Sequence, residues 1–105
     1  MIREVAKISI RPGSESQFEG AFAKAVPLFE RAKGCMSLRL ERSVEELLQY
    51  YVVADWETLE DHVVGFRGSA DYAVWRDLVG GYFSSPPVVD HTEVVINGFQ
   101  ERVGA

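Results

Sequence analysis

The side chains of this sequence best suited to acid–base chemistry are its two histidines, His62 and His91. An ordinary histidine pKa of about 6.5 would let His62 take a proton from an acidic hydroxyl near neutral pH, so His62 is the first candidate for a general base. His62 also shares a predicted helical face with Leu59 and Phe66, which fits a half-buried packing role equally well. The phase of His91 in its predicted strand fits either a pocket or a contact between two copies, and phase alone leaves both open.

Three arginines, Arg39, Arg67 and Arg76, could stabilise an anion formed at such a site, because a guanidinium donates charge-assisted hydrogen bonds. Arg76, which follows Trp75, is the preferred candidate for this role. Arg67 sits at a predicted helix break, where it has a competing structural role in pairing with a nearby acid: Glu60, Asp61 or Asp71. The sequence therefore offers one preferred base and one preferred anion-stabilising residue.

Five aromatic residues could form the walls of a flat apolar slot, since aromatic faces stack on planar ligands and bury a large area. They are Tyr51, Trp56, Phe66, Tyr72 and Trp75. Apolar stripes of this kind also fill ordinary protein cores, so each residue has a packing interpretation beside its pocket interpretation.

The composition excludes several other kinds of site. No Cys, His and Asp grouping has metal-ligand spacing, and the single cysteine, Cys35, excludes the usual cysteine-rich zinc sites, so we expect no metal. Gly80-Gly81 before Tyr82 is typical of a helix end, and no glycine-rich phosphate loop predicts a nucleotide cofactor. A net charge of −5 argues against nucleic acid and anionic membranes as partners. One cysteine needs no oxidising compartment, and no signal peptide or membrane-spanning run is present, which favours a cytoplasmic location.

The elements that must position these side chains follow from periodicity. Alternation predicts strands over residues 5–10 and 35–42, an aromatic and β-branched run predicts one over 47–56, and the last strand is expected over 88–96. A capping-box pattern of Ser14 and Gln17 opens a first helix, which Pro27 should bend or divide. Thr58 and Ser69 predict a second helical region in two pieces, 59–66 and 70–79.

This order predicts an α+β fold of the ferredoxin-like βαββαβ type, with a four-stranded antiparallel sheet and both helices on one face. The 105 residues fit one domain, with a core over 5–96 and a C-terminal extension over 97–105. The other face of the sheet would carry a set too apolar for water: Val5, Val53, Val89 and Val95. We therefore expect a homodimer in which a second sheet covers that face.

Four stretches of the chain, spread over about residues 5–95, together resemble the antibiotic biosynthesis monooxygenase domain. They are Ile10-Arg11-Pro12-Gly13 with Phe18-Glu19, Gly34-Cys35, Trp56-Glu57-Thr58-Leu59-Glu60-Asp61-His62, and Phe66-Arg67-Gly68-Ser69 with Trp75-Arg76. The resemblance implies a dimeric α/β barrel with a pocket in each subunit between the sheet and the second helical region. It also implies oxygen chemistry without flavin, metal or haem. A haem-degrading branch of the superfamily has Asn, Trp and His where this chain has Ala6, Phe66 and Arg76, which argues against haem degradation.

The leading hypothesis is a cofactor-independent monooxygenase that oxidises a quinol-type or polycyclic aromatic with O₂. His62 would be the base and Arg76 the anion stabiliser, and the pocket would be formed by the five aromatic residues with His91. Two alternatives stay open: a non-catalytic dimer that binds a hydrophobic small molecule, and an isomerase or lyase that uses the same pocket without oxygen.

Overall fold

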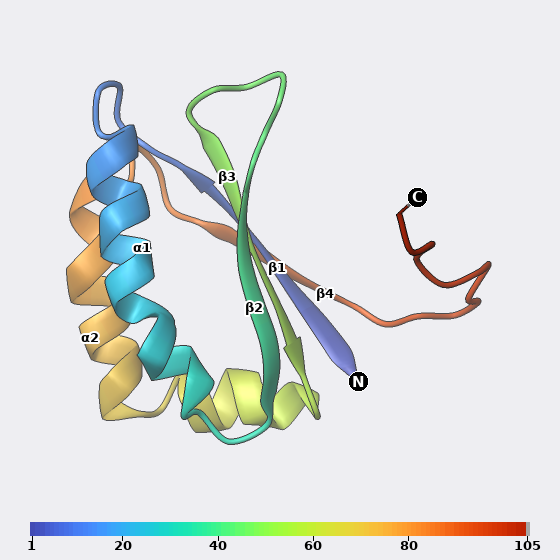
Figure 1. Ribbon diagram of the computed structural model, residues 1–105. Coiled ribbons are helices and arrows are strands. Elements are labelled where there is room, and N and C mark those ends of the chain that lie inside the picture. Colours follow the sequence, from blue (N-terminus) through green and yellow to red (C-terminus); the bar gives the residue numbers. More distant parts are fainter. Residues whose placement is uncertain (105) are drawn as a thin grey trace.

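Four antiparallel strands form one sheet in the order β2-β3-β1-β4, and both long helices pack against one of its faces (Figure 1). This computed structural model describes residues 1–104. The strands are β1 (Ile2–Ser9), β2 (Cys35–Arg42), β3 (Gln49–Trp56) and β4 (Val88–Thr92). The helices are α1 (Glu15–Glu30), the π-helical segment η1 (Asp61–Phe66), α2 (Ala70–Val79) and the short 3₁₀ segment η2 (Gly80–Tyr82). The predicted α+β ferredoxin-like arrangement is confirmed.

The two central strands carry the core because every second residue points under the helices. On β1 these residues are Glu4, Ala6 and Ile8, and all three are buried. Ile8 lies opposite Tyr50 of β3, which is also buried. A strand has a side-chain period of two, so this alternation places the single acidic residue, Glu4, on the covered face of the sheet.

Helix α1 buries Phe18, Phe22, Ala25 and Phe29, but the expected cap at Ser14 is wrong and Pro27 does not divide the helix. The helix is continuous through Pro27, because a proline so close to the C-terminus removes one amide without interrupting many turns. The side chain of Ser14 makes no cap; its hydroxyl donates to the carbonyl of Arg11 at 2.6 Å. Glu15 accepts from the amide of Gly13 instead, at 2.9 Å.

The turn after α1 is fixed by Gly34, whose φ of +82° lies in the left-handed region. A side chain at this position would collide with the carboxylate of Asp61. The carbonyl of Gly34 also accepts from the amide of Glu57 at 2.7 Å. These close approaches hold the start of β2 against the segment that leads into η1.

The second helical region divides as predicted, with a restart at Ser69. The side chain of Ser69 caps α2 by accepting from the amide of Tyr72 at 3.2 Å. The first piece is a π-helix, in which the amide of Arg67 donates to the carbonyl of His62 at 3.1 Å. Such wide turns occur often at functional sites, and this one carries His62.

Strand β4 ends at Thr92, four residues before the predicted end at Ile96. The only strand that pairs with β4 is β1. Thr92 lies opposite Arg3, so only one residue of β1, Ile2, remains beyond that pair. Val95 therefore lies outside the sheet, and Val89 lies opposite Ala6 and packs against the core under the helices. Two of the four residues predicted for the open face are thus elsewhere.

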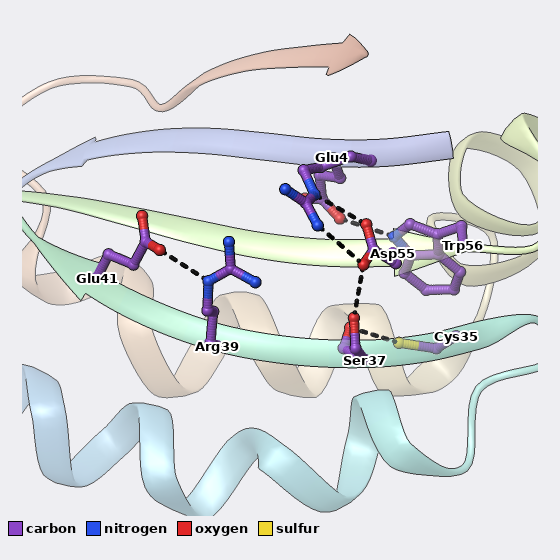
Figure 2. Close-up of polar contacts among 8 residues, drawn as sticks. Glu4, Cys35, Ser37, Arg39, Glu41, Asp55 and Trp56 are labelled. Atoms are coloured by element: carbon purple, nitrogen blue, oxygen red, sulfur yellow. Dashed lines mark hydrogen bonds and ion pairs between the residues drawn. The ribbon is translucent and has the colours of Figure 1, made fainter. Parts of the chain in front are cut away.

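The open face of the sheet is more polar than predicted. Val5 and Val53 are opposite one another on it, and the residues around them form ion pairs and hydrogen bonds. Asp55 accepts from Arg3 at 2.9 Å. Figure 2 shows that Asp55 also accepts from Ser37 and that Arg39 pairs with Glu41, at 2.7 Å. None of the helices in the described residues is long and apolar enough to cross a membrane.

Candidate active site

A cavity of about 290 Å³ lies between the β1 and β4 side of the sheet and the second helical region. Its apolar walls come from β1, α2 and the segment that follows α2, and a few polar side chains converge on it. The lining residues are Glu4, Ala6, Ile8, His62, Arg67, Tyr72, Trp75, Arg76, Phe83, Pro86, Pro87 and Val89. Of the predicted site residues, the structure brings His62, Tyr72, Trp75 and Arg76 together in this lining.

Glu4 is the one carboxylic acid in the cavity lining, and it is only 6% exposed. Its Oε1 accepts from the indole Nε1 of Trp56 at 3.0 Å, a contact visible in Figure 2, and lies 3.2 Å from Nε2 of His62. Its Oε2 has no hydrogen-bond partner within residues 1–104. Burial raises the pKa of Glu4, and the bond from Trp56 and the charge of Arg67 offset part of that rise.

His62 is held from three sides. Its ring stacks on Trp56 with 5.1 Å between centroids, and Nδ1 lies 2.8 Å from Nε2 of His91. Burial, followed by the charges of Arg67 and His91, lowers the pKa of His62 to about 4, so the imidazole is neutral at pH 7. Because Nδ1 is bonded to His91 and Nε2 lies against the carboxylate of Glu4, we do not expect His62 to take a proton directly from a substrate.

His91 reaches this cluster because β4 pairs with β1 and sets His91 directly opposite Glu4. The ring of His91 does not line the cavity; it contacts His62 from the side of the sheet edge. Burial and Arg67 lower the pKa of His91, and Asp90 opposes that change. The structure thus brings the two histidines and Glu4 into contact, with a hydrogen bond between the histidines and an ion-pair contact between His62 and Glu4, an arrangement that the sequence pattern did not reveal.

Arg67 and Arg76 are exposed at the cavity, and neither forms an ion pair or a side-chain hydrogen bond in the part of the chain described. The pairing weighed for Arg67 does not occur with Asp71, whose carboxylate binds Arg31 at 2.7 Å. The guanidinium of Arg76 lies 5.9 Å from the ring centre of Tyr72, within the range of a cation–π contact. Arg39 is remote from this group, because it pairs with Glu41 on the open face.

The predicted aromatic walls divide between cavity, core and open face. Tyr72 and Trp75 line the cavity, whereas Trp56 and Phe66 are buried in the core and only support it. Tyr51 lies opposite Lys7, in phase with the open face of the sheet, and cannot reach the cavity. Its neighbour Tyr50 points under the helices instead, since successive residues of a strand face opposite sides.

Glu4 is the carboxylic acid of the cavity that sequence reasoning missed, because the first strand was expected to begin at Val5. A signal was present: Glu4 is in phase with Ala6 and Ile8, so extending the alternation by one residue would have placed a carboxylate on the apolar face. Residues 1–104 hold no group of three or more His, Cys, Asp or Glu side chains positioned for a metal ion.

A split βαβ sheet covered by helices on one face defines the ferredoxin-like class of small α+β domains. The family model for antibiotic biosynthesis monooxygenase matches residues 1–78, and the chain belongs to that family. The uncharacterised protein YczJ of Bacillus subtilis is 40% identical over 95 residues, which cover 90% of this chain and 100% of YczJ.

Solved structures agree with this assignment. A candidate antibiotic biosynthesis monooxygenase from Bordetella bronchiseptica is 48% identical and superposes with a TM-score of 0.88, covering 90% of this chain and 97% of its own. SnoaB, a cofactor-independent oxygenase from Streptomyces nogalater, has a TM-score of 0.80 with coverage of 94% and 97%. At 14% identity, SnoaB shares the fold alone.

Proposed function

We propose that this protein is a cofactor-independent monooxygenase that oxidises a hydroxylated aromatic of one or two rings with O₂. The observation that carries the proposal is the free Oε2 of Glu4, a buried carboxylate on the wall of an otherwise largely apolar cavity. Family membership supports monooxygenase chemistry in general terms. The residues of the cavity suggest how this chain would carry it out.

The size of the cavity favours a small substrate. Its volume of about 290 Å³ is at the lower end of typical ligand sites, and an apolar cavity of roughly 150 Å³ already holds benzene. Tyr72 and Trp75 offer flat faces to such a ring. A single ring or a fused pair fits this space better than the larger polycyclic substrates that the sequence left open.

Glu4 replaces His62 in our proposal as the general base. Its raised pKa makes it a stronger base than an exposed carboxylate, and Oε2 is free to accept the hydroxyl proton of a quinol. Arg67 and Arg76 form no ion pair or side-chain hydrogen bond in the described chain, so both can stabilise the resulting anion. Neutral His62 and Trp56 hold the carboxylate in place.

The substrate itself supplies the electrons for this reaction. A quinol anion passes an electron to O₂, the two radicals join in a new carbon–oxygen bond, and loss of water leaves a carbonyl group. One quinol and one O₂ give one hydroxyquinone and one water, so no external reductant is required. The tasks of the protein are to bind the ring, take and return protons, and exclude bulk water.

Oxygen uptake with benzene-1,4-diol, naphthalene-1,4-diol and 1,8-dihydroxyanthrone tests the proposal. We expect uptake above the protein-free autoxidation rate for the one- and two-ring quinols, little for the three-ring compound, and incorporation of one ¹⁸O atom per product. Uptake equal to autoxidation for all three would refute it. Turnover of these compounds under argon would instead favour the isomerase or lyase hypothesis, and binding without turnover the non-catalytic one.

We also propose that the protein works as a homodimer in the cytoplasm. Val5 and Val53 on the open face, together with a C-terminal segment whose apolar residues are exposed, provide the surface for a second copy. These residues are Val94, Val95, Ile96, Phe99 and Val103, and Figure 1 shows the segment running away from the sheet. Light scattering should give twice the mass of the 11.8 kDa chain, and a stable particle at the single-chain mass would contradict this.

A further inference from the structure

We propose that the substrate of this cavity is an aromatic hydroxy acid, whose hydroxyl group lies at the cavity floor beside Glu4 and whose carboxylate binds Arg76 at the cavity mouth. The inference rests on the proposed function and deepens it, because it names the chemical class of the substrate and its orientation. Arg76 is then the residue that selects acidic ring compounds over neutral ones.

The cavity lining is positively charged in a chain whose net charge is −5. Its charged residues are one acid, Glu4, and two arginines, Arg67 and Arg76. His62 adds no charge at pH 7, because its pKa is about 4. The lining therefore carries one excess positive charge when Glu4 is ionised and two when Glu4 is protonated. An anionic ligand complements this charge in both states.

Arg76 is available to bind such an anion. Four other arginines each contact a carboxylate at 2.7–3.8 Å, namely Arg3, Arg31, Arg39 and Arg42. Arg76 forms no ion pair or side-chain hydrogen bond within residues 1–104, although acidic residues outnumber basic ones by 16 to 11. A planar guanidinium binds a carboxylate through two parallel hydrogen bonds, so a ligand carboxylate suits this side chain well.

The cavity has a buried floor and an exposed mouth. The buried lining residues are Glu4, Ala6, Ile8, His62 and Trp75. The exposed lining residues are Arg67, Arg76, Pro86 and Pro87. A ligand carboxylate at the mouth keeps part of its hydration, whereas at the floor it would lose its hydration and be repelled by ionised Glu4. The uncharged hydroxyl group therefore belongs at the floor and the carboxylate at the mouth.

The two arginines lie on different sides of the cavity. The charge of Arg67 lowers the pKa of Glu4 and of His62, which places Arg67 on the side of the base. The guanidinium of Arg76 lies over the ring of Tyr72 instead, 5.9 Å from its centre. Arg67 is thus placed to stabilise the anion that forms when the hydroxyl group loses its proton, and Arg76 remains for the carboxylate.

Calorimetry under argon with hydroxynaphthoic acids and their amides tests this inference, because each amide has the shape of its acid without the charge. The acids are 6-hydroxy-2-naphthoic, 5-hydroxy-1-naphthoic and 4-hydroxy-1-naphthoic acid, which place the two groups at different separations. We expect the best-bound acid to bind about fivefold or more tightly than its amide at low ionic strength, and this preference to decrease at high ionic strength.

Two variants assign the preference to Arg76. Arg76→Gln should remove the preference for the acid and still bind the amide, which shows that the variant is folded. Arg11→Gln is the matched control, because Arg11 is also exposed and forms no ion pair among the described residues but does not line the cavity. This control should keep the preference of the wild type.

The inference is overturned if no acid binds more tightly than its amide, or if Arg76→Gln keeps the preference. These measurements need no turnover, so they separate the two proposals. A preference for the acid without oxygen uptake by any of the compounds would keep the ligand class and remove the monooxygenase. Oxygen uptake without a preference for the acid would keep the monooxygenase and remove the hydroxy acid.

Discussion

The low pKa of His62 makes the stability of the protein depend on pH in a way that one substitution should remove. His62 is 2% exposed, and its pKa is lowered from 6.5 to about 4, with burial as the largest cause. Between these two values the unfolded chain binds a proton that the folded chain does not. Stability therefore falls as pH falls from about 6.5 to about 4.

The size of the effect follows from the same shift. At about 1.4 kcal/mol per unit of pKa, the full difference corresponds to about 3 kcal/mol, of which about 2 kcal/mol is lost by pH 5. His62→Gln keeps a polar group at the position but no titrating ring. The wild type should be more stable than the variant at pH 7, and the gap should narrow by about 2 kcal/mol at pH 5.

Urea unfolding followed by circular dichroism at pH 7, 6 and 5, at one protein concentration, measures this gap. Glu4 and His91 also have shifted pKa values, but both residues are present in wild type and variant, so most of their contribution cancels in the difference. A gap that stays constant between pH 7 and pH 5 would refute the assignment of His62 as a neutral buried imidazole.

Two further predictions concern the frame of the site and its walls. Gly34→Ala should lower the free energy of unfolding in urea by about 2 kcal/mol or more, because the positive φ of Gly34 combines with a collision of the new side chain against Asp61. Gly13 has a similar φ but open space around it, so Gly13→Ala should lower the free energy of unfolding clearly less. Equal losses in the two variants would contradict the role of the collision. Trp75→Ala should weaken the binding of 1-naphthol, measured by calorimetry, about tenfold or more. Tyr51→Ala on the open face should leave the affinity unchanged. A larger loss of affinity in Tyr51→Ala than in Trp75→Ala would place the binding site on the other side of the sheet.

The sequence predicted those features of the fold that depend on local pattern. The helix Ala70–Val79 and its cap at Ser69 were readable because an apolar stripe, a capping residue and a breaking glycine all agree there. The sequence did not predict where β4 ends, because that end depends on how many residues of β1 are left to pair with β4. Pro27 does not divide α1, because the effect of a proline depends on its distance from the helix end.

The candidate site was predicted in part. His62, Tyr72, Trp75 and Arg76 do converge on one cavity. The contact between His62 and His91 joins residues 29 positions apart, and it arises from the pairing of β4 with β1, which periodicity does not specify. The proposed role of His62 changed for the same reason. A sequence shows neither that Nδ1 of His62 is bonded to His91 and Nε2 lies against Glu4, nor that burial lowers the pKa of His62.

The central claim is that the carboxylate of Glu4 takes the substrate proton. Oxygen uptake with naphthalene-1,4-diol, corrected for autoxidation, should be compared between wild type, Glu4→Gln and Glu45→Gln, a control at an exposed glutamate in the loop between β2 and β3. We expect kcat/KM to fall by about 100-fold or more in Glu4→Gln, the usual contribution of a general base, and to stay at the wild-type value in Glu45→Gln. Equal rates in wild type and a folded Glu4→Gln protein would contradict the claim.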